Sequence, residues 1–571
     1  MRFFFALTAP LAFALSGCAT NQITPSVAAT PVAAGAVSSA DPRATAAGEA
    51  VLAQGGSAVD AAIAVMLALT VVEPQSSGIG GGGFMVRADG QSQTLVTYDG
   101  REVAPAAATP NRFLDEVGKV LGRDTRVFSG LSVGVPGNIA LAAKAHAAHG
   151  TLPWAKLFEP AIALADGGFV MNPRLHGSLS GNKGRADKSA AAKAVFFGAD
   201  GEPLPVGATV KVPMLAETFR ALALQGPAAM YGSKAATDLA AYVAGETPQD
   251  GRMTAADIAG YTAKERAPVC TRYRVYRICG MGPPSSGGIA VAQMLGQLER
   301  FDLAAMGPDS PQFWHVFIES QRLAYADREL YAGDADFVEV PVAGLVDPVY
   351  VATRSALISP DSALAKPEAG IPPGAPLARG DGPEEPENGT THFAVVDAGG
   401  NAVSYTSTIE GAFGSGLHWG GFYLNNELTD FTLTPEADGK PVANRVEGGK
   451  RPRSSMAPTI VFDADGKPLL VIGAAGGPTI PVTVARAIIG VLDFKLGAQQ
   501  ALALPFAMSF GDTLLIEEGS ALAPMKDALT ALGHTSIRIA AAPIKANALG
   551  RRADGTWEMA TEPRNAGLVT P

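Results

Sequence analysis

Apolar residues recur along the chain with two spacings, one typical of helices and one typical of strands. An apolar run at residues 61–72 follows Ser57 and Asp60, whose spacing is typical of a helical capping box. The run is too short to cross a bilayer, so it predicts a buried core helix. Further helices are predicted around 138–149, 214–225 and 310–327, and strands at 266–281, 392–407, 420–425 and 457–474.

The first residues have the pattern of an export signal. Arg2 precedes an apolar stretch, residues 3–15, that is too short for a spanning helix. It ends in Leu15-Ser16-Gly17-Cys18, which looks like the bacterial lipoprotein box. We therefore expect a signal peptide at 1–17, a lipid on Cys18 and a tether at 18–42 that is rich in Ala, Thr, Ser and Pro. The expected location is periplasmic, with a lipid anchor in the outer membrane as the only membrane contact; an ordinary signal peptide is the alternative.

Composition narrows the class of protein. Apolar residues make up 47% of the 571 residues and charged residues 17%, which is typical of a globular chain, and the length alone predicts more than one compact unit. Gly and Pro are frequent, at 66 and 42 residues, so loops and tight turns are expected. The net charge is −10 and there is no long run of Lys or Arg, which argues against nucleic acid as a partner.

Cys270 and Cys279 flank a predicted hairpin turn. If Tyr273 and Tyr276 bracket a two-residue turn, the register places the two cysteines directly opposite each other. Opposed residues at a non-hydrogen-bonded pair have Cα atoms close enough for a disulfide, and export permits oxidation. A disulfide is therefore expected. Two reduced core thiols are the alternative, because Val275 suits a tight primed turn poorly and a longer loop would change the register.

A proline-rich stretch at 359–389 gives way to an apolar strand that begins at Thr390. Its seven prolines, with glycines and charges, predict an exposed segment without regular structure. A threonine hydroxyl needs a base, and an N-terminal threonine carries one in its α-amine, whose reference pKa is about 7.7–8.0. Gly389 leaves room for the hydroxyl to attack the preceding carbonyl. This pattern predicts cleavage between Gly389 and Thr390; a polar residue that merely starts a strand is the alternative.

Two other motifs are not given a function. The spacing Gly78-x-Gly80-x-x-Gly83 matches a dinucleotide fingerprint, but a helix precedes it and a strand follows, which is the wrong order. These glycines instead indicate close backbone approach in the core. His146 and His149 could face one way on a helix, but Gly150 ends that helix, and histidines in a last turn interact favourably with the helix dipole. We expect no metal site.

Many separate motifs, in a family's order, resemble the gamma-glutamyltransferase family of N-terminal-nucleophile hydrolases from about residue 43 to 520. Among them are Glu73-Pro74-Gln75-Ser76-Ser77, Pro283-Pro284-Ser285-Ser286-Gly287-Gly288, Leu323-Ala324-Tyr325-Ala326-Asp327-Arg328, Gly389-Thr390-Thr391-His392, Asn425-Asn426-Glu427-Leu428-Thr429-Asp430-Phe431 and Arg453-Ser454-Ser455-Met456. The C-terminal fifty residues carry much less of the resemblance.

The resemblance implies a fold and a division of the chain. The expected fold is α+β, a four-layer αββα sandwich, cleaved by itself into two interlocking fragments. Residues 43–389 would form the large fragment and 390–571 the small one, and the two would remain together as a heterodimer. No metal or organic cofactor is expected.

The resemblance also implies roles for individual residues. Thr390 would be both the autoprocessing residue and the nucleophile, and Thr408 would orient it. Gly476 and Gly477 would supply backbone N–H groups to an oxyanion hole. The remaining residues would bind the substrate: Arg101, Ser454 and Ser455 its α-carboxylate, and Glu427 and Asp430 its α-ammonium.

Two departures from the family pattern bear on the substrate. Glu410 stands where the transferases usually have Asn, and only 20 residues separate Asp430 from Arg451, so the lid over the substrate is shortened. Short-lid relatives include acylases that act on glutaryl-cephalosporins. Three acids, Glu410, Glu427 and Asp430, near one pocket nevertheless favour a cationic α-amine, because unpaired buried carboxylates are costly.

We therefore expect a γ-glutamyl substrate, with glutathione as the donor that the resemblance implies and with hydrolysis outweighing transfer. A glutaryl or cephalosporin acylase and a poly-γ-glutamate-processing enzyme are alternatives within the family. The alternative from a different class is a non-catalytic solute-binding lipoprotein that has kept the fold.

Overall fold

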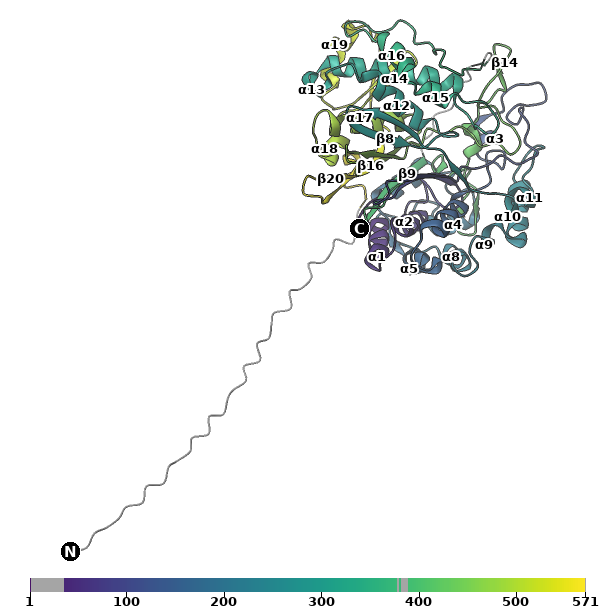
Figure 1. Ribbon diagram of the computed structural model, residues 1–571. Coiled ribbons are helices and arrows are strands. Elements are labelled where there is room, and N and C mark those ends of the chain that lie inside the picture. Colours follow the sequence, from purple (N-terminus) through teal and green to yellow (C-terminus); the bar gives the residue numbers. More distant parts are fainter. Residues whose placement is uncertain (2–34, 377–378, 381–388, 570–571) are drawn as a thin grey trace. The chain divides into compact units, whose positions relative to one another are not determined.

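The computed structural model describes Met1 and residues 35–376, 379–380 and 389–569 (Figure 1). The predicted signal peptide, Cys18 and most of the tether lie outside the described residues. Residues 34–571 form one compact unit, although length alone predicted more than one. Among the described residues, no helix is both long and apolar enough to cross a membrane.

The first large sheet holds the predicted cleavage site. Its six strands pair antiparallel in the order β1-β9-β10-β2-β3-β6. Helix α2 lies against this sheet, and every one of its residues is buried. The strands are β1 (Gly35–Ser38), β9 (Gly389–Asp397), β10 (Ala402–Glu410), β2 (Gly82–Ala88), β3 (Leu95–Asp99) and β6 (Lys264–Arg266), and the covering helices include α1 (Pro42–Ala53), α2 (Ala58–Val72), α4 (Asn138–His149), α5 (Glu159–Gly167) and α8 (Pro213–Gln225).

The second large sheet also has six antiparallel strands, in the order β21-β20-β16-β15-β8-β7. A second apolar core lies between it and its own helices. The strands are β21 (Trp557–Thr561), β20 (Lys545–Arg551), β16 (Pro468–Ala475), β15 (Thr459–Phe462), β8 (Tyr276–Gly280) and β7 (Val269–Tyr273), and the helices include α12 (Gly287–Leu298), α14 (Pro311–Tyr331), α17 (Thr479–Leu492) and α18 (Ala498–Ala503).

The two sheets pack face to face. Ser404 Oγ in β10 donates to the carbonyl oxygen of Ile472 in β16 at 3.0 Å and accepts from Thr459 N at 3.0 Å. A side chain at Gly473 would place its Cβ 2.4 Å from the ring of His392, so glycine is required for the sheets to approach at this point. The order of layers is helix, sheet, sheet, helix, an α+β architecture of the kind expected (Figure 1).

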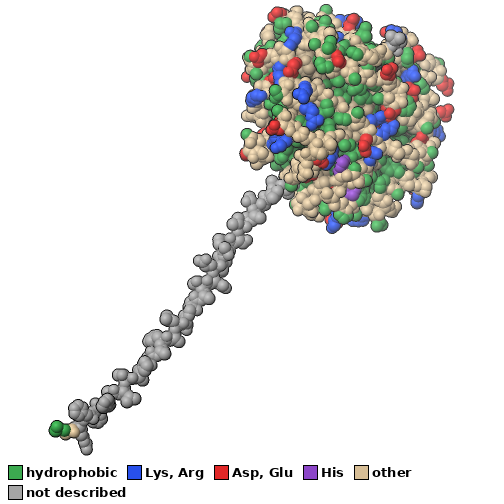
Figure 2. Space-filling view, in the orientation of Figure 1, with side chains coloured by type: hydrophobic (Ala, Val, Ile, Leu, Met, Phe, Trp, Pro, Cys, Tyr) green, Lys and Arg blue, Asp and Glu red, His purple; other side chains and the backbone are tan. Residues whose placement is uncertain are grey.

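The remaining helices and strands complete the fold. They are α3 (Arg123–Val127), η1 (Trp154–Phe158), β4 (Phe169–Val170), α6 (Pro173–Gly181), α7 (Ala190–Phe196), β5 (Thr209–Val210), α9 (Ala228–Tyr231), α10 (Ser233–Gly245), α11 (Ala255–Ala259), α13 (Leu303–Met306), α15 (Val342–Leu345), α16 (Pro348–Ala356), β11 (His418–Trp419), β12 (Phe422–Tyr423), η2 (Glu427–Asp430), β13 (Glu436–Ala437), β14 (Lys440–Pro441), β17 (Ala507–Phe510), β18 (Thr513–Glu517), η3 (Ala523–Met525), α19 (Lys526–Ala531), β19 (Ser536–Ala540) and η4 (Pro563–Asn565). On the face shown in Figure 2, positive and negative side chains are interspersed.

The structure can be compared with three predictions that rest on residues close together in the sequence. The capping box is confirmed, because Ser57 Oγ accepts from Asp60 N at 3.1 Å and Asp60 accepts from Ser57 N at 3.0 Å. Gly80 makes the predicted close approach, since an added Cβ would lie 2.0 Å from the carbonyl oxygen of Tyr423. The strand predicted at 420–425 is reduced to β12.

The tether is shorter than predicted. Residues 35–38 already form β1, which pairs with β9, so the part of the chain up to residue 42 is not all tether. Asp41 then caps α1 by accepting from Arg43 N. The Ala-rich composition of this region does not predict a strand, and β1 forms here by pairing with β9.

The predicted disulfide between Cys270 and Cys279 is present, and the two residues are direct partners in the β7–β8 hairpin. The turn contains Arg274 and Val275. Only Arg274 has a positive φ, at 54°, so Val275 avoids the left-handed conformation that a β-branched residue resists.

Candidate active site

Thr390 lies in β9 directly opposite Thr408 in β10. The two hydroxyl oxygens are 3.1 Å apart, and both residues are buried. Thr408 Oγ1 donates to the carbonyl oxygen of Gly389 at 2.8 Å and accepts from Glu410 N at 2.8 Å. Because Thr408 has one hydroxyl proton and directs it to Gly389, the Thr390 hydroxyl is the donor to Thr408. The pair therefore joins the nucleophile to the carbonyl that it would attack.

Gly389 is needed where it stands. A Cβ at this position would lie 2.4 Å from the carbonyl oxygen of Glu410, inside the contact limit of any side chain. The β9–β10 register shifts between Thr408 and Glu410, and Glu410 adopts φ 70°. This bulge turns the chain so that Gly389 pairs with Glu410 while Thr390 pairs with Thr408.

Gly476 and Gly477 join β16 to the first turn of α17, and both have positive φ, 122° and 57°. A Cβ at Gly476 would lie 2.4 Å from the carbonyl oxygen of Pro543. Thr479 donates from both N and Oγ1 to the carbonyl oxygen of Gly476, which fixes the turn. Backbone amides at the N-terminus of a helix are suited to stabilising negative charge.

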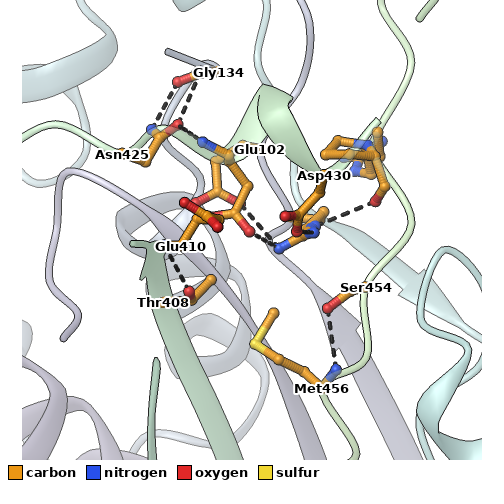
Figure 3. A network of polar contacts seen from close by, with 12 residues as sticks. Glu102, Gly134, Thr408, Glu410, Asn425, Asp430, Ser454 and Met456 are labelled. Carbon is orange, nitrogen blue, oxygen red and sulfur yellow. Dashed lines mark hydrogen bonds and ion pairs between the residues drawn. The ribbon is translucent and has the colours of Figure 1, made fainter. Parts of the chain in front are cut away.

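Arg101 is 1% exposed and lies among the acids of a buried cluster, of which Figure 3 labels Glu102, Glu410 and Asp430. Its guanidinium contacts the carboxylates of Glu427 and Asp430, and it also donates to the carbonyl oxygens of Pro452 and Arg453 at 3.2 and 2.8 Å. The residues predicted to bind opposite ends of a zwitterion are therefore brought together, but here they pair with each other.

Glu410 reaches the same cluster from the end of β10 (Figure 3). Its carboxylate accepts from Asn426 Nδ2, and Asn426 Oδ1 accepts from Arg185 Nη2 at 2.8 Å. Arg185 also donates from Nε to the carbonyl oxygen of Gly414. Arg185 is the second cation near the cluster, and it acts on Glu410 through Asn426 as well as through its charge.

The cluster has more acids than cations. Glu102, Glu410, Glu427 and Asp430 surround Arg101, and the charge of Arg185 also acts on Glu410. Burial raises the pKa of Glu102 to about 7, against the opposing effect of Arg101. Burial, reinforced by Asp430, raises the pKa of Glu410 to about 8. Burial also raises the pKa of Glu427 well above its ordinary value. These three carboxyl groups therefore bind protons more readily than exposed carboxyl groups do.

The two serines are held by the structure around them. Ser454 Oγ accepts from Met456 N at 3.1 Å (Figure 3). Ser455 Oγ accepts from Arg328 Nη2 at 2.7 Å. Arg328 also donates from Nε to Ser286 Oγ at 2.8 Å. The cation next to Ser455 is thus Arg328, although the sequence paired this serine with Arg101.

Sequence reasoning missed Arg185, Asn426 and Arg328 as parts of the site. Arg328 and Asn426 occur within motifs that carry the family resemblance, which is the one signal that could have singled them out. Arg185 lies in no such motif, and only the fold brings it near Glu410. Among the described residues, no group of three His, Cys, Asp or Glu side chains could hold a metal ion.

A buried Thr–Thr pair at a Gly–Thr bond, with a buried acid cluster reached from the end of the same strand pair, is the arrangement of an N-terminal-nucleophile hydrolase. The family model for Gamma-glutamyltranspeptidase matches residues 44–571, and the chain belongs to that family.

Curated relatives cover most of the chain. It is 41% identical over 481 residues to the glutathione hydrolase proenzyme of Bacillus subtilis (strain 168), covering 82% of this chain and 80% of that protein. It is 38% identical over 498 residues to the glutathione hydrolase proenzyme of Escherichia coli (strain K12), covering 85% and 83%. An acylase ACY 1 proenzyme from Pseudomonas sp. (strain SE83) is 35% identical over 526 residues, covering 90% and 89%.

Solved structures show the same architecture. A cephalosporin acylase from Bacillus halodurans superimposes with a TM-score of 0.80 at 25% identity, over 93% of this chain and 94% of that one. The gamma-glutamyltranspeptidase of Helicobacter pylori superimposes with a TM-score of 0.54 at 35% identity, over 57% of this chain and 92% of that one. The likeness therefore extends to both branches considered for the substrate.

Proposed function

We propose that the protein is a self-cleaving γ-glutamyl amidohydrolase and transpeptidase that acts on glutathione and related γ-glutamyl compounds. The observation that carries the proposal is the hydrogen-bonded chain from Thr390 through Thr408 to the carbonyl of Gly389, beside a buried cluster with more acids than cations. The relatives named glutathione hydrolase support the substrate.

Self-cleavage follows from that hydrogen-bonded chain. Thr390 Oγ1 attacks the carbonyl carbon of Gly389, while the Thr408 hydroxyl donates to the carbonyl oxygen and receives the proton of Thr390. As Thr408 receives this proton it transfers its own to the carbonyl oxygen, and that proton moves to the Thr390 nitrogen as the C–N bond breaks, which leaves an ester between Gly389 and Thr390 Oγ1. Water hydrolyses this ester and frees the α-amine of Thr390.

The freed amine then serves as the base for outside substrates. It takes the Thr390 hydroxyl proton as the oxygen attacks the γ-amide, and it returns that proton to the leaving amine. The backbone amides of Gly476 and Gly477 stabilise the oxyanion. Water releases glutamate from the acyl-enzyme, and an amine acceptor gives a new γ-glutamyl compound. With only 20 residues between Asp430 and Arg451, we expect water to be the main acceptor.

The acid cluster favours a substrate with an α-ammonium group. The α-carboxylate of a γ-glutamyl group would take the guanidinium of Arg101, which frees Glu427 and Asp430 to face the ammonium. A glutaryl group has the carboxylate but no ammonium, so it would leave these acids unpaired. The acylases among the relatives make a glutaryl or cephalosporin substrate the second candidate.

The test compares kcat/KM for γ-glutamyl-anilide and glutaryl-anilide, which differ only in the α-amine, with the mature protein. A preference of at least tenfold for the γ-glutamyl compound corresponds to about 1.4 kcal/mol of transition-state binding by the ammonium. Equal rates or a glutaryl preference would instead place the acylase function first. Cleavage of neither compound by protein that has matured at Thr390 would favour the non-catalytic binding lipoprotein.

The location is also a proposal. The lipoprotein-type box that ends at Cys18 supports export and a lipid anchor on the outer membrane. Replacing Cys18 with Ala should release the mature protein into the soluble periplasmic fraction. Membrane association that survives this replacement would contradict the anchor.

A further inference from the structure

Strand β9 has different neighbours on its two edges at Thr390. On one edge lies β10, which carries Thr408 and leads to Glu410 and the acid cluster. On the other edge β1 pairs only with the part from Ala394 to Asp397. The stretch of this edge nearest Thr390 is therefore not covered by β1, and β20 of the second sheet contacts β9 at His392.

Three contacts align strands β16 and β20 of the second sheet with β9 and β10 of the first. Asn547 Nδ2 donates to the carbonyl oxygen of His392 at 2.8 Å, and its strand partner Gly473 packs against the His392 ring. Ser404, the partner of Ala394, contacts Ile472. As β9 runs from Ala394 back to Thr390, the residues of β16 beside it therefore run from Ile472 towards the C-terminal end of β16.

Lys545 lies at the level of Thr390 by this alignment. Its strand partner is Ala475, the residue before Gly476 and Gly477. Lys545 Nζ donates to Ser76 Oγ at 2.9 Å. The same turn holds Glu73, which accepts from the hydroxyl of Thr391 at 3.0 Å. Lys545 therefore lies two positions beyond Asn547 in β20, in the direction of Thr390, and it contacts the turn whose Glu73 binds the neighbouring Thr391.

The charge of Lys545 is not balanced locally. Among the described residues it forms no ion pair, and the nearby Glu73 is paired with Arg174 at 2.5 Å. Burial and the charge of Arg174 lower the pKa of Lys545 to about 7. A half-buried amine of this kind gains a partner when an anion binds.

Lys545 also lines a cavity of about 510 Å³, a size typical of ligand pockets. Arg174 and the hydroxyl-bearing residues Ser38, Ser39 and Thr45 line it as well. One acid, Glu562, reaches the cavity, and its carboxylate is bound to Arg564 at 2.6 Å. The lining therefore suits a small molecule that carries a negative charge.

We infer that Lys545 binds the carboxylate of the group that leaves from the γ-glutamyl bond, an amino acid or short peptide, and that this cavity receives it. The inference rests on the proposed function, because it needs a γ-glutamyl substrate at Thr390. The acid cluster then takes the cationic head of the substrate, and Lys545 takes the anionic tail on the other side. A dipeptide spans at most about 7 Å, which sets the reach required.

The experiment compares kcat/KM for glutathione and for glutathione amide, in which the glycine carboxylate is a neutral carboxamide. Wild-type protein should prefer the acid by at least fivefold. Lys545→Gln should reduce this ratio below twofold, whereas Lys545→Arg should retain most of it. Lys234→Gln, the same change at an exposed lysine of α10, is the matched control and should keep the wild-type ratio.

A wild-type ratio near one would overturn the inference, as would an unchanged ratio in Lys545→Gln. If Lys545→Gln does not mature into two fragments, two measurements on wild type decide the question. They are the ratio above and the inhibition by Cys-Gly compared with that by Cys-Gly amide. Equal inhibition by the two compounds would overturn the inference. Cleavage of γ-glutamyl-anilide, whose leaving group has no carboxylate, separates the two proposals. If wild type does not cleave the anilide, the proposed function fails; if it does while the ratio stays at one, only Lys545 loses its role.

Discussion

At the scale of single residues, the site depends on one hydroxyl with three hydrogen bonds. Thr408 contacts the Thr390 hydroxyl, the carbonyl oxygen of Gly389 and the amide of Glu410. In the proposed self-cleavage it both polarises the carbonyl under attack and accepts the proton of the attacking hydroxyl. A side chain of the same shape without the hydroxyl would lose both effects.

Replacing Thr408 with Val should therefore slow self-cleavage about 10²–10³-fold, the usual cost of removing one oxyanion donor. The measurement is the uncut fraction on a denaturing gel over time after purification. Thr408→Ser keeps the hydroxyl and should cleave much faster than Thr408→Val. A Thr408→Val protein that matures as fast as wild type would show that this hydroxyl has no part in the step.

A second residue-scale prediction concerns Glu410. Its pKa is raised to about 8 and that of Glu102 to about 7, so both lose protons as pH rises through 7–8. An ammonium ligand binds better to ionised carboxylates and a glutaryl ligand binds worse. The ratio of kcat/KM for γ-glutamyl-anilide to that for glutaryl-anilide should therefore rise between pH 6 and pH 8.5. Taking the ratio cancels the titration of the Thr390 amine, which both substrates use.

Glu410→Gln removes one of the titrating groups and should flatten this rise. This neutral variant removes a negative charge and leaves the positive charge of Arg185 in place. It should therefore lower the preference for the ammonium at high pH. An identical pH dependence in wild type and Glu410→Gln would mean that Glu410 does not sense the ligand.

At the scale of elements, the sequence predicts what neighbours along the chain decide. The capping box of α2, the β7–β8 hairpin and the strand that begins at the cleavage site all rest on residues within a few positions of each other. The strand β1 was missed because its stability comes from pairing with β9, more than 350 residues later. Tertiary packing, rather than a local sequence preference for strand, therefore makes this segment a strand.

The same distinction holds for the site: motifs in the sequence identify some of its residues, but only the fold brings them into contact. The family motifs gave the identities of Thr390, Arg101 and Asp430, but not that Arg101 pairs with Asp430 across 329 positions. Nor did they bring Arg185 to Glu410, because no periodicity connects the loop after α6 with the end of β10. Charge pairing inside a core is a property of the fold and becomes visible only in three dimensions.

The hairpin offers a test at this scale. The disulfide closes a loop of about ten residues at the edge of the second sheet, for which the chain-entropy relation gives about 2–3 kcal/mol of stabilisation. Replacing both Cys270 and Cys279 with Ala should lower the urea midpoint while self-cleavage at Thr390 proceeds normally. Reduction of wild type with a thiol should reproduce the shift, and it should do nothing to the double variant. An unchanged midpoint in both cases would mean that packing alone holds the hairpin.

At the scale of the whole molecule, the two predicted fragments share both sheets. In the first sheet, β9 and β10 from the small fragment lie between β1 and β2 from the large one. In the second, β15, β16, β20 and β21 follow the cleavage site and β7 and β8 precede it. Each apolar core likewise contains residues from both sides of Gly389.

Cutting one peptide bond therefore should not separate the fragments. The mature protein should elute from a sizing column as a single species at the volume of uncut Thr390→Ala, and give two bands on a denaturing gel with a new N-terminus at Thr390. Separation would expose the central strands of both sheets and much of each core, so the fragments should part only when the fold itself unfolds in denaturant. Two species eluting apart in native buffer would contradict the interleaved sheets, and a wild-type chain that stays uncut would remove the mechanism built on Thr390.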